Sequence, residues 1–121
     1  MQHTRYEQDF QHLRIAVLRS HGDAGTDLRE HIEARAAQLS GRTIDHREIL
    51  PPPLGDFVDK VAQHAYKVTD ADFHDLERAG YSEDAIFEIT VCAAVGAGSA
   101  RFEQAMAALN GAADTGEGEP A

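Results

Sequence analysis

The sequence has a single cysteine, Cys92, among its 121 residues. An intrachain disulfide is therefore excluded, and with it the class of small secreted domains that disulfides hold together. The first residues contain no apolar signal core, so we expect a cytoplasmic protein. No apolar run approaches the ~20 residues that a membrane-spanning helix needs, and we expect no membrane partner.

Basic residues are scarce. The 11 Lys and Arg residues stand against 21 Asp and Glu residues, which gives a formal net charge of −10. The arginines are scattered among acids and form no basic patch. Because nucleic-acid backbones and anionic membranes repel such a surface, we expect no nucleic-acid partner either.

The usual ligand patterns for metals and phosphates are also missing. The histidines lie at positions 3, 12, 21, 31, 46, 64 and 74, and no two of them are three or four residues apart. No single helix face can therefore present a pair of histidine ligands. No glycine loop follows a strand, which leaves a phosphate cradle unsupported. We predict no metal and no cofactor.

Tryptophan is absent and aromatic residues make up only 7% of the chain, so Ala, Leu, Val and Ile must build the core. The length suits a single domain. Apolar residues recur at helical spacing in several segments, although residues 15–18 alone are also compatible with a buried strand. We predict an all-α fold of about five helices, at 8–20, 26–40, 54–68, 70–79 and 83–109.

Helix starts and stops are well marked in the second half. Thr69, followed by Asp70 and Asp72, is a good N-cap for the fourth predicted helix. Gly80 ends that helix, as a residue able to take a positive φ should. Ser82 caps the fifth predicted helix.

We assign residues 1–109 to a single helical domain. In its second helix, the charged side chains of Arg29, Glu30 and Glu33 are expected to cover the solvent side. Residues 110–121 are small and acidic and have no means of burying themselves, so we predict a disordered acidic tail.

Gly96 and Gly98 are unusual inside an apolar helix, because each costs about 1 kcal/mol relative to alanine in a helix interior. Together with neighbouring alanines they form a surface that another backbone can approach closely. The approaching helix belongs either to the same chain or to another subunit. Short helices cannot cover so apolar a helix, and we therefore expect the chain to associate.

Three segments of the second half form a distinctive combination. They read His-Ala-Tyr-Lys-Val-Thr-Asp at 64–70, Ala-Gly-Tyr-Ser-Glu-Asp at 79–84 and Ile-Phe-Glu-Ile-Thr-Val-Cys-Ala-Ala-Val-Gly-Ala at 86–97. This combination of a cap, a glycine stop and an Ala/Gly-rich helix resembles the alkylhydroperoxidase D and carboxymuconolactone decarboxylase superfamily. The resemblance implies an all-α fold around a helical hairpin, and a homo-oligomer that is commonly a trimer or a hexamer.

The peroxidase members of that superfamily use a Cys-x-x-Cys pair, with a nearby His and Glu that relay protons. One thiol is oxidised by the peroxide, and the other resolves it to a disulfide. This sequence has no Cys-x-x-Cys motif, so neither role carries over to Cys92, and we predict that thiol peroxidase activity is absent. Because Cys92 lies inside an apolar helix, well past the first turn, we predict a buried and inert thiol.

His64, Tyr66 and Glu88 are the candidate pocket residues. His64 borders the apolar stripe of the third predicted helix and could act as a general base or bind a small acid. The alternative is a partly exposed histidine bonded to backbone or water. Glu88 has apolar neighbours, and desolvation there would raise its pKa. The alternatives are a solvated position and a salt bridge to a neighbouring subunit.

Three functions remain open. The first is a superfamily member without thiol peroxidase activity that serves as an accessory, scaffold or small-ligand-binding protein. The second is a non-thiol enzyme of the lyase or decarboxylase type, which would hold a small organic acid or lactone between the third and fifth helices. In that enzyme His64 is the base, and Glu88 or Tyr66 assists. The third is a partner-binding module that docks through its acidic tail or its small-residue face.

Overall fold

The computed structural model describes residues 5–41 and 49–116 of the chain. These residues form five α-helices and one 3₁₀ helix, and they contain no strand. The prediction of an all-α fold with about five helices is therefore confirmed. In chain order the elements are α1 (Arg5–Arg19), α2 (Thr26–Leu39), α3 (Leu54–His64), η1 (Ala65–Lys67), α4 (Asp70–Arg78) and α5 (Glu83–Gly116).

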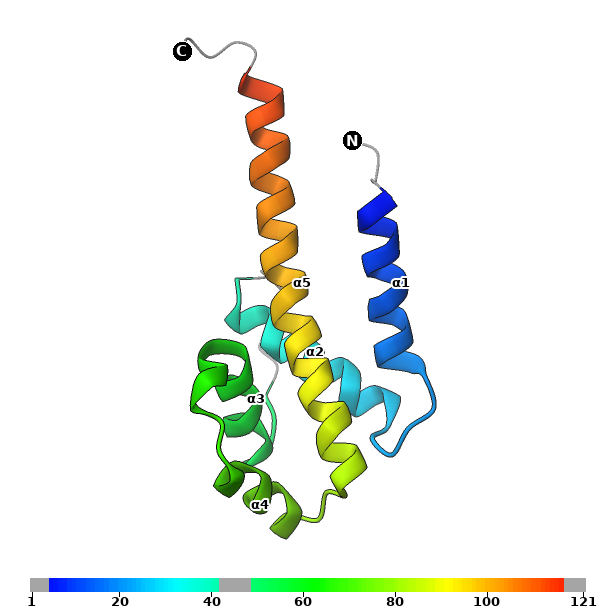
Figure 1. Ribbon diagram of the computed structural model, residues 1–121, viewed down its shortest axis with the longest axis vertical. Helices are drawn as coiled ribbons and strands as arrows, with labels where there is room; N and C mark the ends of the chain where they lie inside the picture. The colour runs from blue at the N-terminus through cyan, green and yellow to red at the C-terminus, as the bar shows by residue number, and fades with distance from the viewer. Residues whose placement is uncertain (1–4, 42–48, 117–121) are drawn as a thin grey trace.

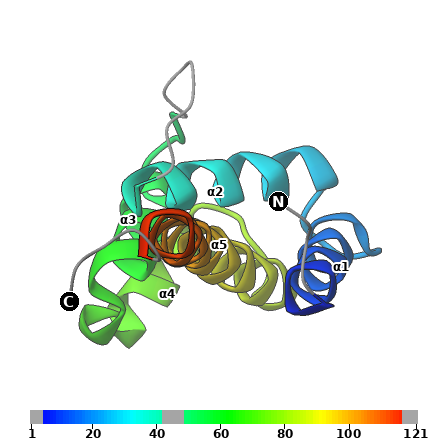
Figure 2. The ribbon, with the colours of Figure 1, turned by 90° about the horizontal axis from the view of Figure 1, so that it is seen from above.

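The long helix α5 is the axis around which the other helices pack (Figure 1). α2 crosses α5 and makes the most extensive contacts with it. α1 lies on one flank of α5, and α3 and α4 lie on the other (Figures 1 and 2). The core between these helices is largely aliphatic, as the scarcity of aromatic residues requires. Its fully buried side chains include Ile32, Val58, Leu76 and Ile89.

α2 approaches α5 so closely at Gly96 that no side chain fits between them. A Cβ atom on Gly96 would lie 2.3 Å from the carbonyl oxygen of Glu33 on α2. Around Gly98 the corresponding position has no atom within 4 Å. Packing within one chain therefore accounts for the glycine at position 96, but it does not account for the glycine at position 98.

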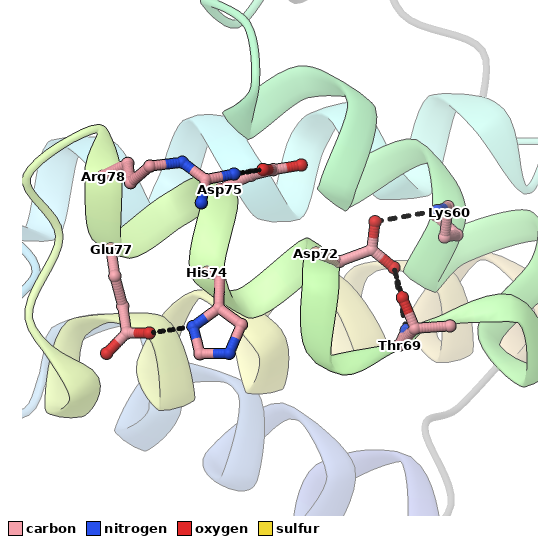
Figure 3. Close-up of polar contacts among 7 residues, drawn as sticks. All are labelled: Lys60, Thr69, Asp72, His74, Asp75, Glu77 and Arg78. Atoms are coloured by element: carbon pink, nitrogen blue, oxygen red, sulfur yellow. Dashed lines mark hydrogen bonds and ion pairs between the residues drawn. The ribbon is translucent and has the colours of Figure 1, made fainter.

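The predicted start of α4 is confirmed. Thr69 is the N-cap residue, and its backbone N–H and its hydroxyl donate to Oδ2 of Asp72 at 2.8 and 3.4 Å (Figure 3). Lys60 of α3 donates to the other oxygen of this carboxylate at 2.8 Å. These hydrogen bonds hold the pKa of Asp72 below its usual range, and the bond from Lys60 has the largest effect. One carboxylate thus caps α4 and connects it to α3.

Gly80 and Ser82 turn the chain from α4 into α5, as predicted. Gly80 has a φ of +104°, a conformation that side chains rarely adopt. Ser82 Oγ accepts the N–H of Ala85 at 3.0 Å and donates to Asp23, in the loop between α1 and α2, at 3.1 Å. The cap of α5 is therefore also a contact with the first loop.

α2 begins at Thr26, as predicted, with Gly25 as its N-cap residue. Other boundaries differ from the predicted ones. α1 begins at Arg5, three residues earlier than predicted from the apolar pattern. α3 ends at His64 because the chain tightens into η1 and then extends at Val68 to begin the cap of α4.

α5 is longer than predicted, because it continues past residue 109 and ends at Gly116. The alanines on both sides of Gly111 favour a helix strongly enough to continue it through that glycine. Residues 110–116 of the predicted tail are therefore helical. Residues 117–121 lie outside the described part of the chain.

α5 also corrects the expectation that no segment is long and apolar enough to span a membrane. Within the described residues, Glu83–Gly111 is the one stretch that qualifies by length and composition. Half of its apolar 18-residue stretch is buried inside the protein. The core helices of globular proteins can be equally long and apolar, so length and composition alone do not make this helix a membrane span.

Gly96→Ala should destabilise the protein, since the new Cβ must push the backbones of α2 and α5 apart. We expect the free energy of unfolding to fall by about 1–3 kcal/mol, the usual cost of overpacking. Gly111→Ala, in the same helix but with open space around it, is the matched control. It should raise stability by at most ~1 kcal/mol, through helix propensity. Urea denaturation followed by circular dichroism measures both variants, and equal effects would contradict the close crossing.

Candidate functional site

Cys92 lies on α5 one turn before Gly96 and is fully buried in the core. Burial raises the pKa of its thiol to about 11, and the charges of Glu88 and Glu33 act in the same direction, whereas that of Arg29 opposes them. The thiol is therefore protonated at neutral pH, which is the poorly nucleophilic form. The predicted burial of Cys92 is confirmed.

Arg29 of α2 is 3% exposed, and its guanidinium holds the end of α1. Nε donates to the carbonyl of Ala24 and Nη1 to that of Val17, both at 2.9 Å, and Nη2 donates to the carbonyl of Ser20. The last carbonyls of a helix have no partner within the helix. Arg29 therefore supplies donors to the end of α1 and to the loop that follows it.

Glu33 lies one turn after Arg29 on α2 and is also 3% exposed. Its Oε2 accepts a hydrogen bond from Nε of Arg14 at 2.6 Å, which connects α1 to α2 a second time. The same bond is the largest cause that raises the pKa of Arg14 above its usual value. The prediction that Arg29 and Glu33 cover the solvent side of α2 is therefore wrong, because both side chains are buried against α1 and the loop after it.

A pocket of about 360 Å³ opens beside this ion pair, between α1 and α2. We call it the α1–α2 pocket. Its lining contains more carboxylates than cationic groups. The sequence does not predict this pocket, because its lining side chains come from two helices and form no motif on either helix. The lining residues are Arg14, Leu18, Asp27, Glu30, His31, Glu33 and Ala34.

Glu88 faces the loop between α1 and α2. Its two carboxylate oxygens accept the backbone N–H groups of Ala24 at 2.7 Å and of Asp23 at 3.0 Å. These hydrogen bonds lower the pKa of Glu88, and the bond from Ala24 has the largest effect. The charges of Arg29 and His21 act in the same direction. Desolvation alone would raise the pKa of Glu88, but the hydrogen bonds outweigh it. The carboxylate therefore holds the loop between α1 and α2 in place.

His64 and Tyr66 lie together at the junction of α3 and η1, away from Glu88. Their rings form a T-shaped contact with centroids 6.0 Å apart, and both side chains are exposed, Tyr66 to 81%. Along α5, the residue that reaches this end of α3 is Arg101, which donates to the carbonyl of Ala62 at 2.8 Å. Arg101 is about 20 Å further along the helix than Glu88, at ~1.5 Å per residue. The structure therefore brings His64 and Tyr66 together and leaves Glu88 apart.

A second hollow, of about 480 Å³, lies between α4 and α5. We call it the α4–α5 groove. Its walls are mostly apolar, and two carboxylates lie at its rim. One of them is Glu77, whose Oε1 lies 3.1 Å from Nδ1 of the exposed His74 on α4 (Figure 3). The residues that line the groove are Phe73, Glu77, Glu83, Ile86, Phe87 and Thr90.

Within residues 5–41 and 49–116, no group of three or more His, Cys, Asp or Glu side chains is arranged to hold a metal ion. Comparisons of the chain with models of protein families, with curated proteins and with solved structures find no match. The resemblance to the alkylhydroperoxidase D and carboxymuconolactone decarboxylase superfamily therefore stays a prediction from the sequence.

Arg29→Met should destabilise the protein strongly, because it removes a nearly buried guanidinium that donates to the carbonyls of Val17, Ser20 and Ala24. We expect a loss of about 2–4 kcal/mol in the free energy of unfolding. Arg19→Met is the matched control, since Arg19 is 66% exposed and lies 3.9 Å from Glu30. It should change stability by no more than ~0.5 kcal/mol. Urea denaturation measures both, and similar losses would argue against the role of Arg29.

Glu88 should make stability depend on pH in the acid range. The pKa of Glu88 in the folded protein lies below its ordinary value of 4.5, so its contribution is complete above that pH. The contribution disappears as the pH falls through the lower, folded-state pKa. We therefore expect Glu88→Gln to be less stable than the parent at neutral pH, and the difference to shrink in acid. Urea denaturation at a series of pH values tests this. Asp72 titrates in the same direction in both proteins, so a difference that stays constant with pH would contradict the assignment.

Proposed function

We propose that this protein belongs to the alkylhydroperoxidase D and carboxymuconolactone decarboxylase superfamily, has no thiol peroxidase activity, and serves as an accessory, scaffold or small-ligand-binding protein. It acts in the cytoplasm as a homo-oligomer. The support for the family is the combination of segments at 64–70, 79–84 and 86–97, together with the all-α fold around a long helix.

The observation that carries the proposal is the state of Cys92. Its side chain is fully buried, its pKa is raised to about 11, and the chain holds no second cysteine. A peroxidatic thiol has to meet the peroxide as a thiolate, and a second thiol has to resolve the oxidised sulfur. One chain of this protein supplies neither condition.

The other polar groups near Cys92 support a structural role as well. Arg29 and Glu88 bond the backbone of the loop between α1 and α2 and of the end of α1, and Glu33 bonds Arg14. Breaking a buried, bonded charge away from its partner costs about 3–5 kcal/mol. Side chains that hold the fold in this way are poorly suited to leave their partners during a catalytic cycle.

For a small ligand, the α1–α2 pocket is the site that the geometry favours. Its volume of about 360 Å³ lies within the range of small-molecule sites. Asp27, Glu30 and Glu33 outnumber the cationic groups in its lining. The ligand class that suits this lining is a small molecule carrying a positive charge.

The alternative function, a non-thiol lyase or decarboxylase, has less support. It needs His64 as base with Glu88 or Tyr66 assisting in an enclosed site, whereas Glu88 bonds Ala24 and Asp23, and both His64 and Tyr66 are exposed. His64 and Tyr66 are neighbours, and Glu88 lies apart from them.

Peroxide consumption in the presence of a thiol reductant tests the proposal. The protein should consume peroxide no faster than Cys92→Ala does, because a buried, protonated thiol is a poor nucleophile. Cys92 should also react with a chromogenic thiol reagent only when denaturant is added, which is the internal control for reagent activity. Robust peroxide turnover that Cys92→Ser abolishes would refute the proposal.

A further inference from the structure

The side of α5 opposite α2 is apolar and uncovered. Figure 2 shows α2 on one side of α5, α1 and α4 on its flanks, and no helix of the described chain on the remaining side. A helix at a protein surface usually places polar residues there. Here a row of apolar residues and glycine runs along that side, and we call it the outer stripe: Phe87, Val91, Ala94, Gly98, Phe102, Ala105 and Leu109.

The outer stripe is exposed at its ends and at its middle. Phe87 and Leu109 are 69% and 60% exposed, and Gly98 has open space where a side chain would stand. Phe102 is partly covered by Phe10 of α1, whose ring stacks on it with centroids 5.0 Å apart. An apolar surface of this length on a soluble protein usually marks an interaction site.

The outer stripe is symmetric about Gly98. Its members follow one another in steps of 4, 3, 4, 4, 3 and 4 residues, which read the same in both directions. This spacing averages about 3.67 residues per turn, close to the ~3.6 of a straight helix, so the stripe stays on one side of α5 over about 33 Å. A symmetric stripe of this kind is complementary to itself when two copies run antiparallel.

We propose that two copies of this chain associate through their outer stripes, antiparallel and around a two-fold axis at Gly98. Gly98 of one copy meets Gly98 of the other, and the absence of side chains there lets the two backbones approach. Large residues meet small ones at the inner positions, which is what close packing needs. The pairs on each side of the axis are Val91 with Ala105, Ala94 with Phe102, and Phe87 with Leu109.

The α4–α5 groove enlarges this interface. Two helix faces about 33 Å long and about 10 Å wide bury on the order of 700 Å² in total, which is below the ~1,200 Å² of a stable interface. Phe87 belongs both to the outer stripe and to the wall of the groove. Leu109 of the second copy, opposite Phe87, therefore arrives beside an apolar hollow of about 480 Å³, and the dimer contains this contact twice.

A second copy suits the outer stripe better than a lipid surface does. The stripe itself carries no charge, and Glu77 and Glu83 lie beside its Phe87 end, where anionic lipid would repel them. α5 also cannot enter a bilayer alone, since α2 is packed against its other side at Gly96. The inference rests on the homo-oligomer of the proposed function and specifies its interface. A hexamer with three-fold and two-fold axes contains such a pair, whereas a trimer does not.

Cysteine cross-linking in the full-length Cys92→Ala protein tests the pairing. Under mild oxidation, Gly98→Cys should form a covalent dimer, because residues at a two-fold axis meet their own copies. A mixture of Phe87→Cys and Leu109→Cys proteins should cross-link at least about tenfold faster than either protein alone. Leu13→Cys, on the exposed side of α1, is the control for random collision. Self-cross-linking of Phe87→Cys above this control, or none at Gly98→Cys, would overturn the inference.

Light scattering over a range of concentrations completes the test. The parent should form a dimer or a larger even-numbered assembly, and Leu109→Lys should raise its dissociation constant about tenfold or more. Leu13→Lys, a change of the same kind on α1, should leave it unchanged. A trimer would rule out this interface, but it would agree with the homo-oligomer of the proposed function. A monomer would overturn both, and binding of that monomer to phosphatidylcholine vesicles would identify lipid as the occupant of the stripe.

Discussion

The contact of the α2 backbone with α5 at Gly96 sets the position of most other elements. Since a glycine leaves nothing between the two helices, the depth and the crossing point of α2 are fixed by backbone atoms. Arg29 and Glu33 are carried by α2 to the places from which they reach the end of α1 and Arg14. Cys92 lies one turn away on α5 and is fully buried beside this crossing.

The loop between α1 and α2 is held from two directions. From α2, Arg29 bonds the carbonyl of Ala24; from α5, Glu88 bonds the N–H groups of Ala24 and Asp23. Ser82 adds a bond from the cap of α5 to the side chain of Asp23. The charged groups of Arg29 and Glu88 therefore position a loop and the start of α2.

Local signals in the sequence predicted the elements well. Thr69, Gly80 and Ser82 act through their own neighbours, so their roles can be read without the fold. The end of α5 was predicted too early, because the acidic composition near the terminus obscured the helix propensity of its alanines.

The environment of the candidate site could not be predicted in the same way, because distant residues create it. Glu88 has apolar neighbours in sequence, but its donors lie more than sixty residues away, and they reverse the expected direction of its pKa shift. The burial of Arg29 and Glu33 had a signal, since with Ile32 and Ala36 they follow the i, i+3, i+4, i+7 spacing of a buried face. The prediction that these charged side chains cover the solvent side is wrong, because their bonds to α1 and the loop after it allow them to be buried.

The order of the helices along the chain has a consequence for synthesis. α2 packs mainly on α5, and residues from Glu33 to Gly96 must be made before that contact can form. While the ribosome is still producing this stretch, α2 can contact α1 and α3 but lacks α5, the helix on which it packs most extensively. Full compaction of the core therefore waits until α5 has emerged.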